Sequence, residues 1–469
     1  MRRLLAFLPF LLIGSCTRNF SEVKMLNISG TVRLSGAVDF SEVTVSLYPA
    51  AAADTALSNL RGKFAGVGFP ITQSAIFDHR RQEAAYRTQT DAEGFFKFSN
   101  IPQGDYNLAA EKRGYGWRYH YNIDDDTMVP ELVLYPDVRV AGALDAYTVW
   151  TAQHHWVIVN DAAVPEGGTL LIDKGAVVRF ETYSRLTVNG QLNIYGSADE
   201  MVWFTADAID RQNLGAWKAV EVRGQGAISY ARFDRGDVGI YNRGGRVALT
   251  RSLFRDIRDR GVLSGNESSV EISECLFVDC KTAIQIESRS TAAVHHNRIA
   301  NVAAVNPNSS GIVSNLSSAV ITDNVVAECG VGGSIEFEGS AEFNHNFVTG
   351  CTIGVNVVSL VREKSTVKLE LNTVSNSADA AINILDNATP LITQNNLLQG
   401  ERGLFIRAYS LKYPNYESIA ASNNYFAQSA AEVRRRIVDT RTDNSGASGK
   451  WEIVIDPVSS TPFVDAYPR

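Results

Sequence analysis

Three side chains that could carry acid–base or metal chemistry recur at intervals of 22 to 27 residues: His296, Asp323 and His345. Two imidazoles flanking a carboxylate could share a proton or a divalent cation, provided that the fold stacks them. Arg251 and Glu274 precede them at similar intervals. The alternative is therefore a solvated surface strip with favourable charge pairs between neighbouring strands.

A second group of candidate residues lies near the C-terminus. Tyr409, Tyr413 and Tyr416 fall close together, and Tyr425 follows. Tyrosine combines an apolar ring with a polar hydroxyl, which suits stacking against a sugar ring. We therefore predict carbohydrate binding at Tyr409, Tyr413 and Tyr416. The alternative is that a long loop packs these rings onto the end of the fold.

An internal repeat beyond residue 228 must position these residues. One turn position, often Asn, recurs every 21 to 29 residues. Its members are Ala231, Ser252, Cys275, Asn297, Asn324, Asn346, Asn372, Asn395 and Asn424. The position three residues earlier is always apolar: Ile228, Leu249, Ile272, Val294, Ile321, Phe343, Leu369, Ile392 and Ala421. The position two residues later is apolar as well: Phe233, Phe254, Phe277, Ile299, Val326, Val348, Val374, Leu397 and Phe426.

These columns predict a solenoid of stacked β-coils. Each repeat holds short strands joined by turns, and like residues stack at about 4.8 Å per coil. We expect a right-handed parallel β-helix over residues 138–469, with the apolar columns inside and the Asn column forming a hydrogen-bonded ladder between coils. Open solenoid ends need caps. Residues 430–436 are expected to form a short capping helix.

The stretch from Gly168 to Phe180, followed by Leu186–Gly196, completes the first coils. Together with the repeat, it resembles pectate-lyase-like parallel β-helix proteins. That resemblance implies a fold and leaves the activity open, since such proteins include lyases, hydrolases and epimerases of acidic polysaccharides as well as members without known activity. The Gly-x-Asp-Asp run of polygalacturonase-type enzymes and an aspartate cluster for calcium are both missing from the sequence.

Residues 26–122 predict a separate small β-domain. The run Thr90-Asp91-Ala92-Glu93-Gly94-Phe95-Phe96-Lys97-Phe98, followed by Pro102, Gly104 and Tyr106, alternates strands and turns. It resembles the carboxypeptidase regulatory-like domain, a prealbumin-like antiparallel β-sandwich that serves as a spacer or binding module. Residues 50–85 exceed the usual loop of that family, which indicates an insertion. Residues 123–137 are expected to be a linker.

The N-terminus predicts export and lipid attachment. Arg2-Arg3 precedes an apolar run, Leu4–Ile13, which is too short to span a bilayer. Leu12-Ile13-Gly14-Ser15-Cys16 resembles a bacterial lipobox. The resemblance implies a signal peptide over residues 1–15, lipidation of Cys16 and a short tether over residues 16–25. The alternative is an ordinary secretory signal. Thr17 rather than Asp follows the cysteine, which in such proteins favours the outer membrane.

Charge and cysteine content narrow the choice of partners. The net charge of −7 argues against nucleic acid and against charge-driven binding to anionic lipid. No metal motif is evident and no cofactor is expected. Asp124-Asp125-Asp126 lacks the spacing of a calcium loop, although calcium remains conceivable. Cys280, Cys329 and Cys351 share one column of the repeat and are expected to be buried thiols, with a Cys329–Cys351 disulfide as the alternative.

Three functions remain open. We favour a cell-envelope lipoprotein whose rigid β-helix binds glycan or another surface protein without catalysis. The first alternative is a lyase or hydrolase of an acidic polysaccharide. The second is a structural adhesin or assembly component.

Overall fold

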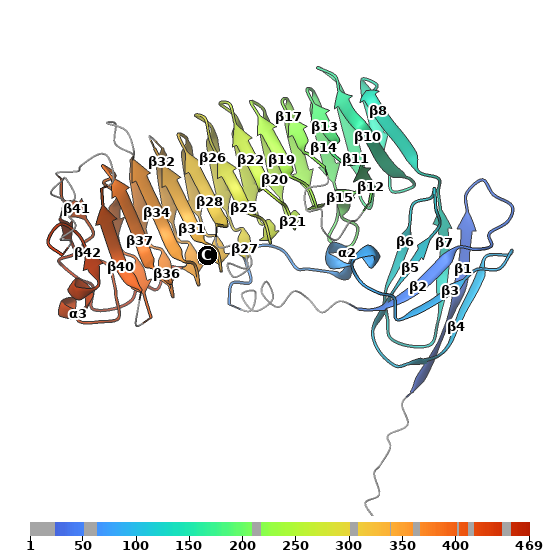
Figure 1. Cartoon of the computed structure of the whole chain (residues 1–469), viewed down its shortest axis with the longest axis horizontal. Helices are drawn as coiled ribbons and strands as arrows, with labels where there is room; N and C mark the ends of the chain where they lie inside the picture. The colour runs from blue at the N-terminus through green and yellow to red at the C-terminus, as the bar shows by residue number, and fades with distance from the viewer. Residues whose placement is uncertain are drawn as a thin grey trace, which may run out of the picture.

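The computed structural model describes residues 24–50, 63–208, 217–300, 308–337, 339–359, 366–400, 403–410, 417–442 and 452–469. A small domain of two β-sheets at the N-terminal end adjoins a long right-handed parallel β-helix (Figure 1). The expected all-β fold class is confirmed.

The first domain is a sandwich of two sheets. One contains β4 (Phe95–Pro102), β1 (Met25–Leu34) and β7 (Thr127–Leu134). The other contains β3 (Tyr86–Gln89), β2 (Thr44–Pro49), β5 (Tyr106–Glu111) and β6 (Arg118–Ile123). Alternating apolar residues such as Ile28, Val45 and Phe96 meet between the sheets.

Strand β7 differs from the expected linker. It lies within residues 123–137 and pairs in parallel with β1, whereas β4 pairs antiparallel on the other side of β1. Val129 and Leu134 of β7 are buried in the sandwich core, so burial of these side chains holds the segment in the sheet. The small domain therefore extends to residue 134, and β8 (Val138–Ala143) starts the solenoid.

The solenoid has three faces, which we name the open face, the covered face and the third face. The open face is an 11-stranded parallel sheet: β9 (Tyr147–Trp150), β11 (Thr169–Asp173), β14 (Gln191–Tyr195), β17 (Gln225–Ser229), β20 (Arg246–Thr250), β23 (Ser269–Ser273), β26 (Thr291–His295), β29 (Ser318–Thr322), β32 (Ser340–Asn344), β35 (Val367–Glu370) and β38 (Leu391–Thr393).

The covered face comprises the first half of β10 (His155–Val164) and then β12 (Val177–Phe180), β15 (Val202–Ala206), β18 (Ala231–Asp234), β21 (Leu253–Arg255), β24 (Leu276–Val278), β27 (Arg298–Ala300), β30 (Val325–Ala327), β33 (Phe347–Thr349), β36 (Thr373–Ser375) and β39 (Asn396–Leu398). Most of these strands are only three or four residues long, because a turn follows each one.

The third face comprises the second half of β10 and then β13 (Arg185–Val188), β16 (Val220–Val222), β19 (Val238–Arg243), β22 (Arg260–Gly265), β25 (Thr282–Ile286), β28 (Ser310–Asn315), β31 (Val331–Glu336), β34 (Ile353–Ser359), β37 (Ala380–Asp386) and β40 (Leu404–Tyr409). The expected cap is present as helix α3 (Ala430–Arg435), with the short strands β41 (Ile419–Ala420), β42 (Ile437–Val438) and β43 (Ile453–Val454) beside it.

The interior of the solenoid follows the predicted columns. Phe204, Phe233, Phe254 and Phe277 stack with ring centroids 4.7–4.8 Å apart. The Asn ladder is confirmed from Asn297 to Asn424, since each side-chain amide donates to the side-chain oxygen of the next Asn at 2.9–3.1 Å. None of the four cysteines in the described part of the chain is in a disulfide, and all four are buried.

Two segments from opposite ends of the chain lie on the covered face. The strap, residues 63–81, belongs to the expected insertion and contains α2 (Gln73–Ile76) and a 3-10 turn, η1 (His79–Arg81). The tail, residues 463–469, returns from the C-terminal cap to the middle of the solenoid, where Arg469 contacts Asp323 and His345 (Figure 1). Phe64 of the strap meets Tyr467 of the tail above Phe347.

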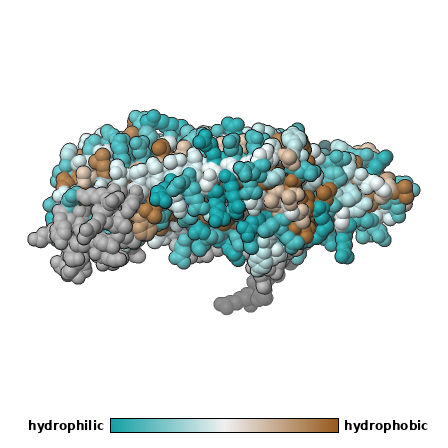
Figure 2. Space-filling view, turned by 90° about the horizontal axis from the view of Figure 1, so that it is seen from above, coloured by the Kyte–Doolittle hydropathy of each residue, from teal (hydrophilic) through white to brown (hydrophobic). Residues whose placement is uncertain are grey.

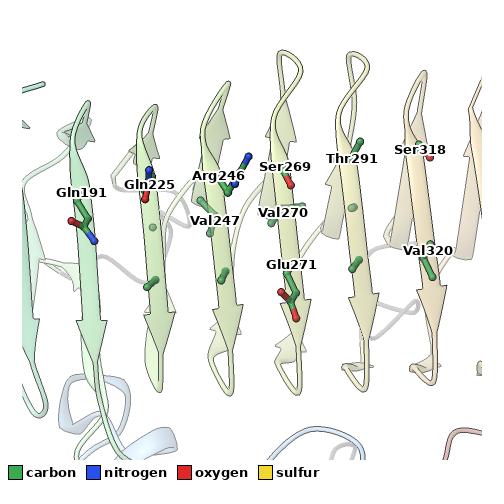
Figure 3. Close-up of a pocket in the computed structure, with 15 residues that line it drawn as sticks. Gln191, Gln225, Arg246, Val247, Ser269, Val270, Glu271, Thr291, Ser318 and Val320 are labelled. Atoms are coloured by element: carbon green, nitrogen blue, oxygen red, sulfur yellow. The ribbon is translucent and has the colours of Figure 1, made fainter. Parts of the chain in front are cut away.

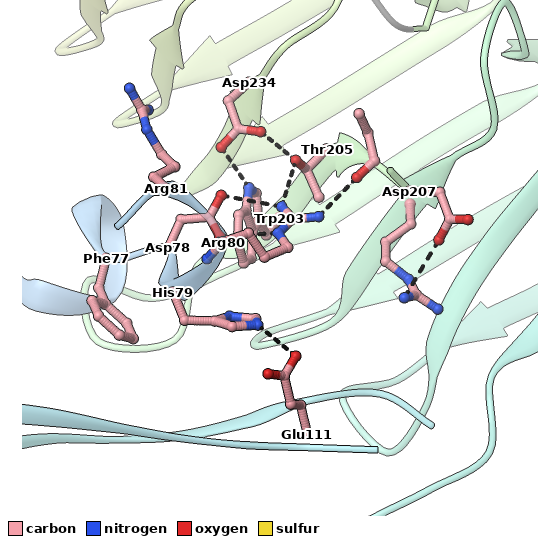
Figure 4. A network of polar contacts seen from close by, with 12 residues as sticks. Phe77, Asp78, His79, Arg80, Arg81, Glu111, Trp203, Thr205, Asp207 and Asp234 are labelled. Carbon is pink, nitrogen blue, oxygen red and sulfur yellow. Dashed lines mark hydrogen bonds and ion pairs between the residues drawn. The ribbon is translucent and has the colours of Figure 1, made fainter. Parts of the chain in front are cut away.

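The strap is fixed to the solenoid by a buried polar network (Figure 4). Arg232 donates to the Phe77 carbonyl at 2.9 Å and to Asp234 at 3.1 Å. Asp234 also accepts from the indole of Trp203 at 2.8 Å. Burial alone would raise the pKa of Asp78, but the adjacent guanidinium of Arg80 lowers it to about 2. These charges are therefore compensated inside the interface.

The side of the molecule seen from above is mainly hydrophilic. Seen from above, hydrophobic residues are scattered in small groups and form no continuous band on the visible surface (Figure 2). A surface of this kind faces water or polar partners.

Candidate functional site

The open face presents three outward columns of side chains. Strands of this sheet pair in strict register, so that Gln225, Arg246 and Ser269 stand next to one another on consecutive coils. Because side chains alternate across a strand, every second residue points away from the core. The outward residues are therefore free to vary without disturbing the apolar interior.

A groove of about 560 Å³ runs across this face, and Figure 3 shows its lining on six consecutive strands. The central outward column is hollow because Ala227, Ala248 and Ala293 are small. The polar side chains of one flanking column form the edge of the groove: Gln191, Gln225, Arg246, Ser269, Thr291 and Ser318.

A second hollow of about 360 Å³ continues the groove toward the other outward column. It shares Ala227, Ala248 and Glu271 with the first and adds the side chains of Tyr195, Ser229, Thr250 and Ser273. We name the two hollows together the groove. Polar side chains border it on both sides, and its floor consists of the methyl groups of Ala227, Ala248 and Ala293 with the side chain of Glu271 between the last two.

Two charges lie in the groove. The side chain of Glu271 is 60% exposed, and one of its carboxylate oxygens lies 3.6 Å from Nε2 of His295. Among the residues that the structure describes, the guanidinium of Arg246 meets no carboxylate. The groove therefore offers one cation, one anion and many neutral hydrogen-bonding groups to a ligand.

The residues of the predicted acid–base strip lie elsewhere, at the corner between the open and covered faces. His296, Asp323 and His345 occupy one position of successive coils with φ of 56°, 58° and 54°. Each precedes a ladder Asn, and this left-handed position turns the chain from one sheet into the next. The strip is thus a column of turn residues and lies outside the groove.

The tail occupies part of this strip. The Arg469 amide donates to Oδ1 of Asp323 at 3.0 Å, and the Arg469 guanidinium lies 2.6 Å from Nε2 of His345. Oδ2 of Asp323 accepts from the Thr322 hydroxyl at 2.6 Å. Burial and the positive charge of Arg469 lower the pKa of His345. Asp323 and His345 therefore already have partners within the chain.

His296, on the neighbouring coil, makes contacts of its own. Its Nδ1 lies 3.1 Å from Nδ1 of His295, and its carbonyl accepts from the Gly68 amide of the strap at 2.7 Å. Within the described residues, no group of three or more His, Cys, Asp or Glu side chains could hold a metal ion.

Of the other predicted site residues, the structure describes only Tyr409. Tyr409 ends β40 on the third face, with the Arg407 guanidinium 5.3 Å from its ring centroid. Tyr413, Tyr416 and Cys16 lie outside the described residues. Sequence reasoning missed the groove, although a signal was present: alanines occupy the central position of β17, β20 and β26 where neighbouring coils carry larger residues.

The comparisons with known proteins concern the solenoid. Residues 218–361 match the family model described as a right handed beta helix region. No curated protein matches the sequence. In the described part of the chain, no helix is long and apolar enough to cross a membrane.

Two solved structures are similar in part. The periplasmic alginate epimerase AlgG has a TM-score of 0.39 at 10% identity, covering 66% of this chain and 78% of its own. The Bacillus anthracis TIE protein has a TM-score of 0.14 at 10% identity, covering 25% of this chain and 19% of its own. Similarity at this level assigns no activity, so the chemistry of this chain must be argued from its own residues.

Proposed function

We propose that this protein is a glycan-binding protein of the cell envelope and that the groove on the open face holds an extended segment of a polysaccharide chain. The observation that carries the proposal is the groove itself, a long hollow bordered by hydroxyl and amide side chains, with alanines and the carboxylate of Glu271 on its floor. Its walls repeat with the coils, at about 4.8 Å. A polymer with repeating hydroxyls suits a binding surface that also repeats.

The character of the lining supports a sugar ligand. Ser, Thr and Gln side chains both donate and accept hydrogen bonds, as sugar hydroxyls do. Tyr147 and Tyr195 project from the same sheet with 66% and 52% of their surface exposed. Exposed aromatic rings beside a polar groove favour stacking on the apolar faces of sugar rings.

A glycan array followed by calorimetry on the best ligand tests this proposal. Ala248→Trp fills the floor of the groove and is expected to abolish binding, while Arg246→Ala is expected to weaken it about tenfold, as for loss of a charged hydrogen bond. Leu391→Trp is the matched control, because Leu391 lies on the same sheet at β38, outside the groove. Binding that survives Ala248→Trp, or an array without any ligand, would contradict the proposal.

A second candidate is an enzyme acting on an acidic polysaccharide, which the Glu271–His295 pair favours. A carboxylate beside an imidazole can serve as acid and base when both reach the substrate. Incubation with a panel of uronic-acid polysaccharides, followed by assays for new reducing ends and unsaturated products, tests it. If the wild type turns over a substrate, and Glu271→Gln abolishes turnover but keeps binding, the protein is an enzyme and the non-catalytic proposal is wrong.

The proposed cellular localisation rests on the N-terminal sequence. We place the protein on the outer membrane through a lipid on Cys16, with the first domain acting as a carboxypeptidase regulatory-like spacer. Labelled palmitate should be incorporated into the wild-type chain and not into Cys16→Ala. Equal labelling of both would disprove lipidation at this residue.

A structural adhesin or assembly component remains the third possibility. It would interact through protein surfaces and leave the glycan array without ligands.

A further inference from the structure

Three arginines gather around one buried glutamate on the third face of the solenoid. Glu221 lies in the middle of β16, and its side chain is 3% exposed. Its carboxylate faces the guanidinium groups of Arg185, Arg223 and Arg243 at 3.4, 2.7 and 3.4 Å. We name these four residues the arginine cluster.

The strand register brings the cluster together. Strands β13, β16 and β19 are neighbours on three consecutive coils, and each contributes a member or leads into one. Val222 pairs with Asn242, so Arg223 and Arg243 follow at the same level on adjacent coils. Neighbouring strands are about 4.8 Å apart, and two positive charges held this close repel each other. The arrangement is favourable only where anions compensate it.

Positive charge exceeds negative charge in this part of the third face. Asp161 balances Arg185, from which it lies 3.4 Å away. Arg223 and Arg243 are left with the single carboxylate of Glu221. Burial alone would raise the pKa of Glu221, but the three guanidinium groups lower it, so this carboxylate is ionised at neutral pH. One positive charge remains uncompensated within the group.

The excess continues around the corner toward the open face. Only Gly244 and Gly245 separate Arg243 from Arg246, the first residue of β20. Figure 3 shows the guanidinium of Arg246 on the side of the turn that leads into this strand. Among the residues that the structure describes, Arg246 forms no ion pair. Arg223, Arg243 and Arg246 together therefore exceed Glu221 by two positive charges.

A ligand can reach the guanidinium groups. The side chains of Arg185, Arg223 and Arg243 are 33%, 45% and 47% exposed, whereas the carboxylate that they share is buried. A guanidinium carries five N–H donors, and Glu221 occupies only those that face inward. Because this contact already fixes the arginines, an anion that binds the outer donors orders little further side-chain structure.

The outer donors suit a phosphoryl group. Guanidinium groups bind phosphate through paired N–H donors in a fixed planar fork. Donors from two adjacent coils match an anion with several oxygens better than a planar carboxylate, which offers two. A phosphoryl group also carries about two negative charges at pH 7, which equals the excess of Arg223, Arg243 and Arg246 over Glu221.

We propose that the arginine cluster binds a phosphoryl group between Arg223 and Arg243, with Glu221 as the residue that positions both guanidinium groups. Inorganic phosphate and a phosphorylated sugar share this group and are the two sources of the ligand. The site lies on the third face, so it does not require that the groove binds a glycan.

Calorimetry on the full-length chain in a buffer without phosphate tests the proposal. The probes are inorganic phosphate, glucose-6-phosphate and glucuronate, each at millimolar concentration. Both phosphorylated probes are expected to bind, and glucuronate is expected to bind more weakly than either. Tighter binding of glucose-6-phosphate than of phosphate identifies the phosphorylated sugar as the source. Equal or weaker binding identifies inorganic phosphate.

Variants of the cluster locate the bound group. Arg223→Ala and Arg243→Ala should each raise the Kd for phosphate about tenfold, as for loss of a charged hydrogen bond. Glu221→Gln keeps the shape of the side chain and removes the competing negative charge, so the Kd should fall. A merely structural role of Glu221 would not tighten binding. Melting curves verify folding, and the two arginine variants keep the test valid if Glu221→Gln does not fold.

Two controls separate the cluster from the rest of the surface. Arg251 is 44% exposed, as the cluster arginines are, but it has the carboxylate of Glu274 as a partner of its own. Arg251→Ala should leave the Kd for phosphate unchanged. Ala248→Trp blocks the groove and should also leave it unchanged, because Ala248 points outward on the open face.

Four results would overturn the proposal. They are the failure of both phosphorylated probes to bind, tighter binding of glucuronate than of both, wild-type affinity in folded Arg223→Ala and Arg243→Ala, and an equal loss in Arg251→Ala. Loss of phosphate binding in Ala248→Trp would move the site to the groove and overturn it as well. A glycan array without ligands would contradict the groove proposal and leave this one intact.

Discussion

The open face and the covered face belong to the same coils but have opposite exteriors. On the open face the central outward column is at least partly exposed to solvent, with Ala227, Ala248, Glu271, Ala293 and Val320 in the groove. On the covered face the first outward column is large and buried, for example Leu253, Leu276 and Phe347. A side chain at an outward position does not pack in the interior of the solenoid. Its residue type therefore depends on whether solvent or another segment of the chain lies against it.

The difference identifies which side of the solenoid is available to ligands. Strap and tail bury the covered face along most of its length, through Arg232, Leu276, Arg298, Thr373 and Asn396. The open face has no such cover among the described residues. Substitutions on the covered face should therefore affect stability, and substitutions on the open face should affect binding.

The largest effect is expected at the buried network of the covered face. Asp234→Ala removes the acceptor of Trp203, Thr205 and Arg232 and leaves a buried guanidinium without its carboxylate. Breaking a buried pair in this way costs about 3–5 kcal/mol. Urea unfolding measures the loss.

Glu267→Ala is the control for Asp234→Ala, since its ion pair with Arg289 is largely exposed. It should change stability little. Equal losses in the two variants would show that the network beneath the strap contributes no more than a surface pair.

A smaller loss is expected for Leu276→Ala. Leu276 is fully buried and points outward against Phe69 and Ile76 of the strap. Truncation of such a residue costs about 2–5 kcal/mol, depending on how far the strap collapses into the space. Val320→Ala on the open face, where Val320 is 46% exposed, should cost far less in the same unfolding experiment.

The stability should also depend on pH through His155. Burial depresses its pKa in the folded chain, whereas an unfolded histidine titrates near 6.5. Below about pH 6.5 the unfolded state takes up a proton that the folded state refuses, so stability falls as the pH decreases and is unaffected above that range. The slope from this group can reach about 1.4 kcal/mol per pH unit. Comparison of the wild type with His155→Phe between pH 7 and 5 measures it, and identical slopes would refute the assignment.

The smallest effect is expected at the predicted acid–base strip, His296, Asp323 and His345. Arg469→Ala removes a positive charge beside His345, so the pKa of this imidazole should rise toward its ordinary value. NMR titration of the ring protons provides the measurement. An unchanged pKa would mean that the tail does not rest on the strip in solution.

The solenoid could be predicted because its interior repeats. The Asn ladder and the phenylalanine stack follow from residue types at fixed spacing, since stacking like on like leaves a visible column. The exterior was harder. The spacing of His296, Asp323 and His345 predicts an outward strip, but their residue types give no sign that this position is left-handed. The same column also holds Tyr230 and Leu371.

The strap was recognised only as an insertion. Its apolar residues, such as Phe64 and Phe69, do not repeat, so nothing in the sequence of the strap shows where it docks. The signal lay in the solenoid, where large apolar residues at outward positions of β21, β24 and β33 require a cover. The groove could not be predicted from the sequence, because small outward residues such as its alanines are common on any exposed strand.

The meeting of Phe64 and Tyr467 above Phe347 has a mechanical consequence. A stack of coils held only by neighbour contacts would peel from one end when pulled. In this chain, a load applied at residue 24 passes through the first domain and the strap to the middle of the stack, where the tail carries it on to the far cap. The coils between are then loaded in shear rather than opened one at a time.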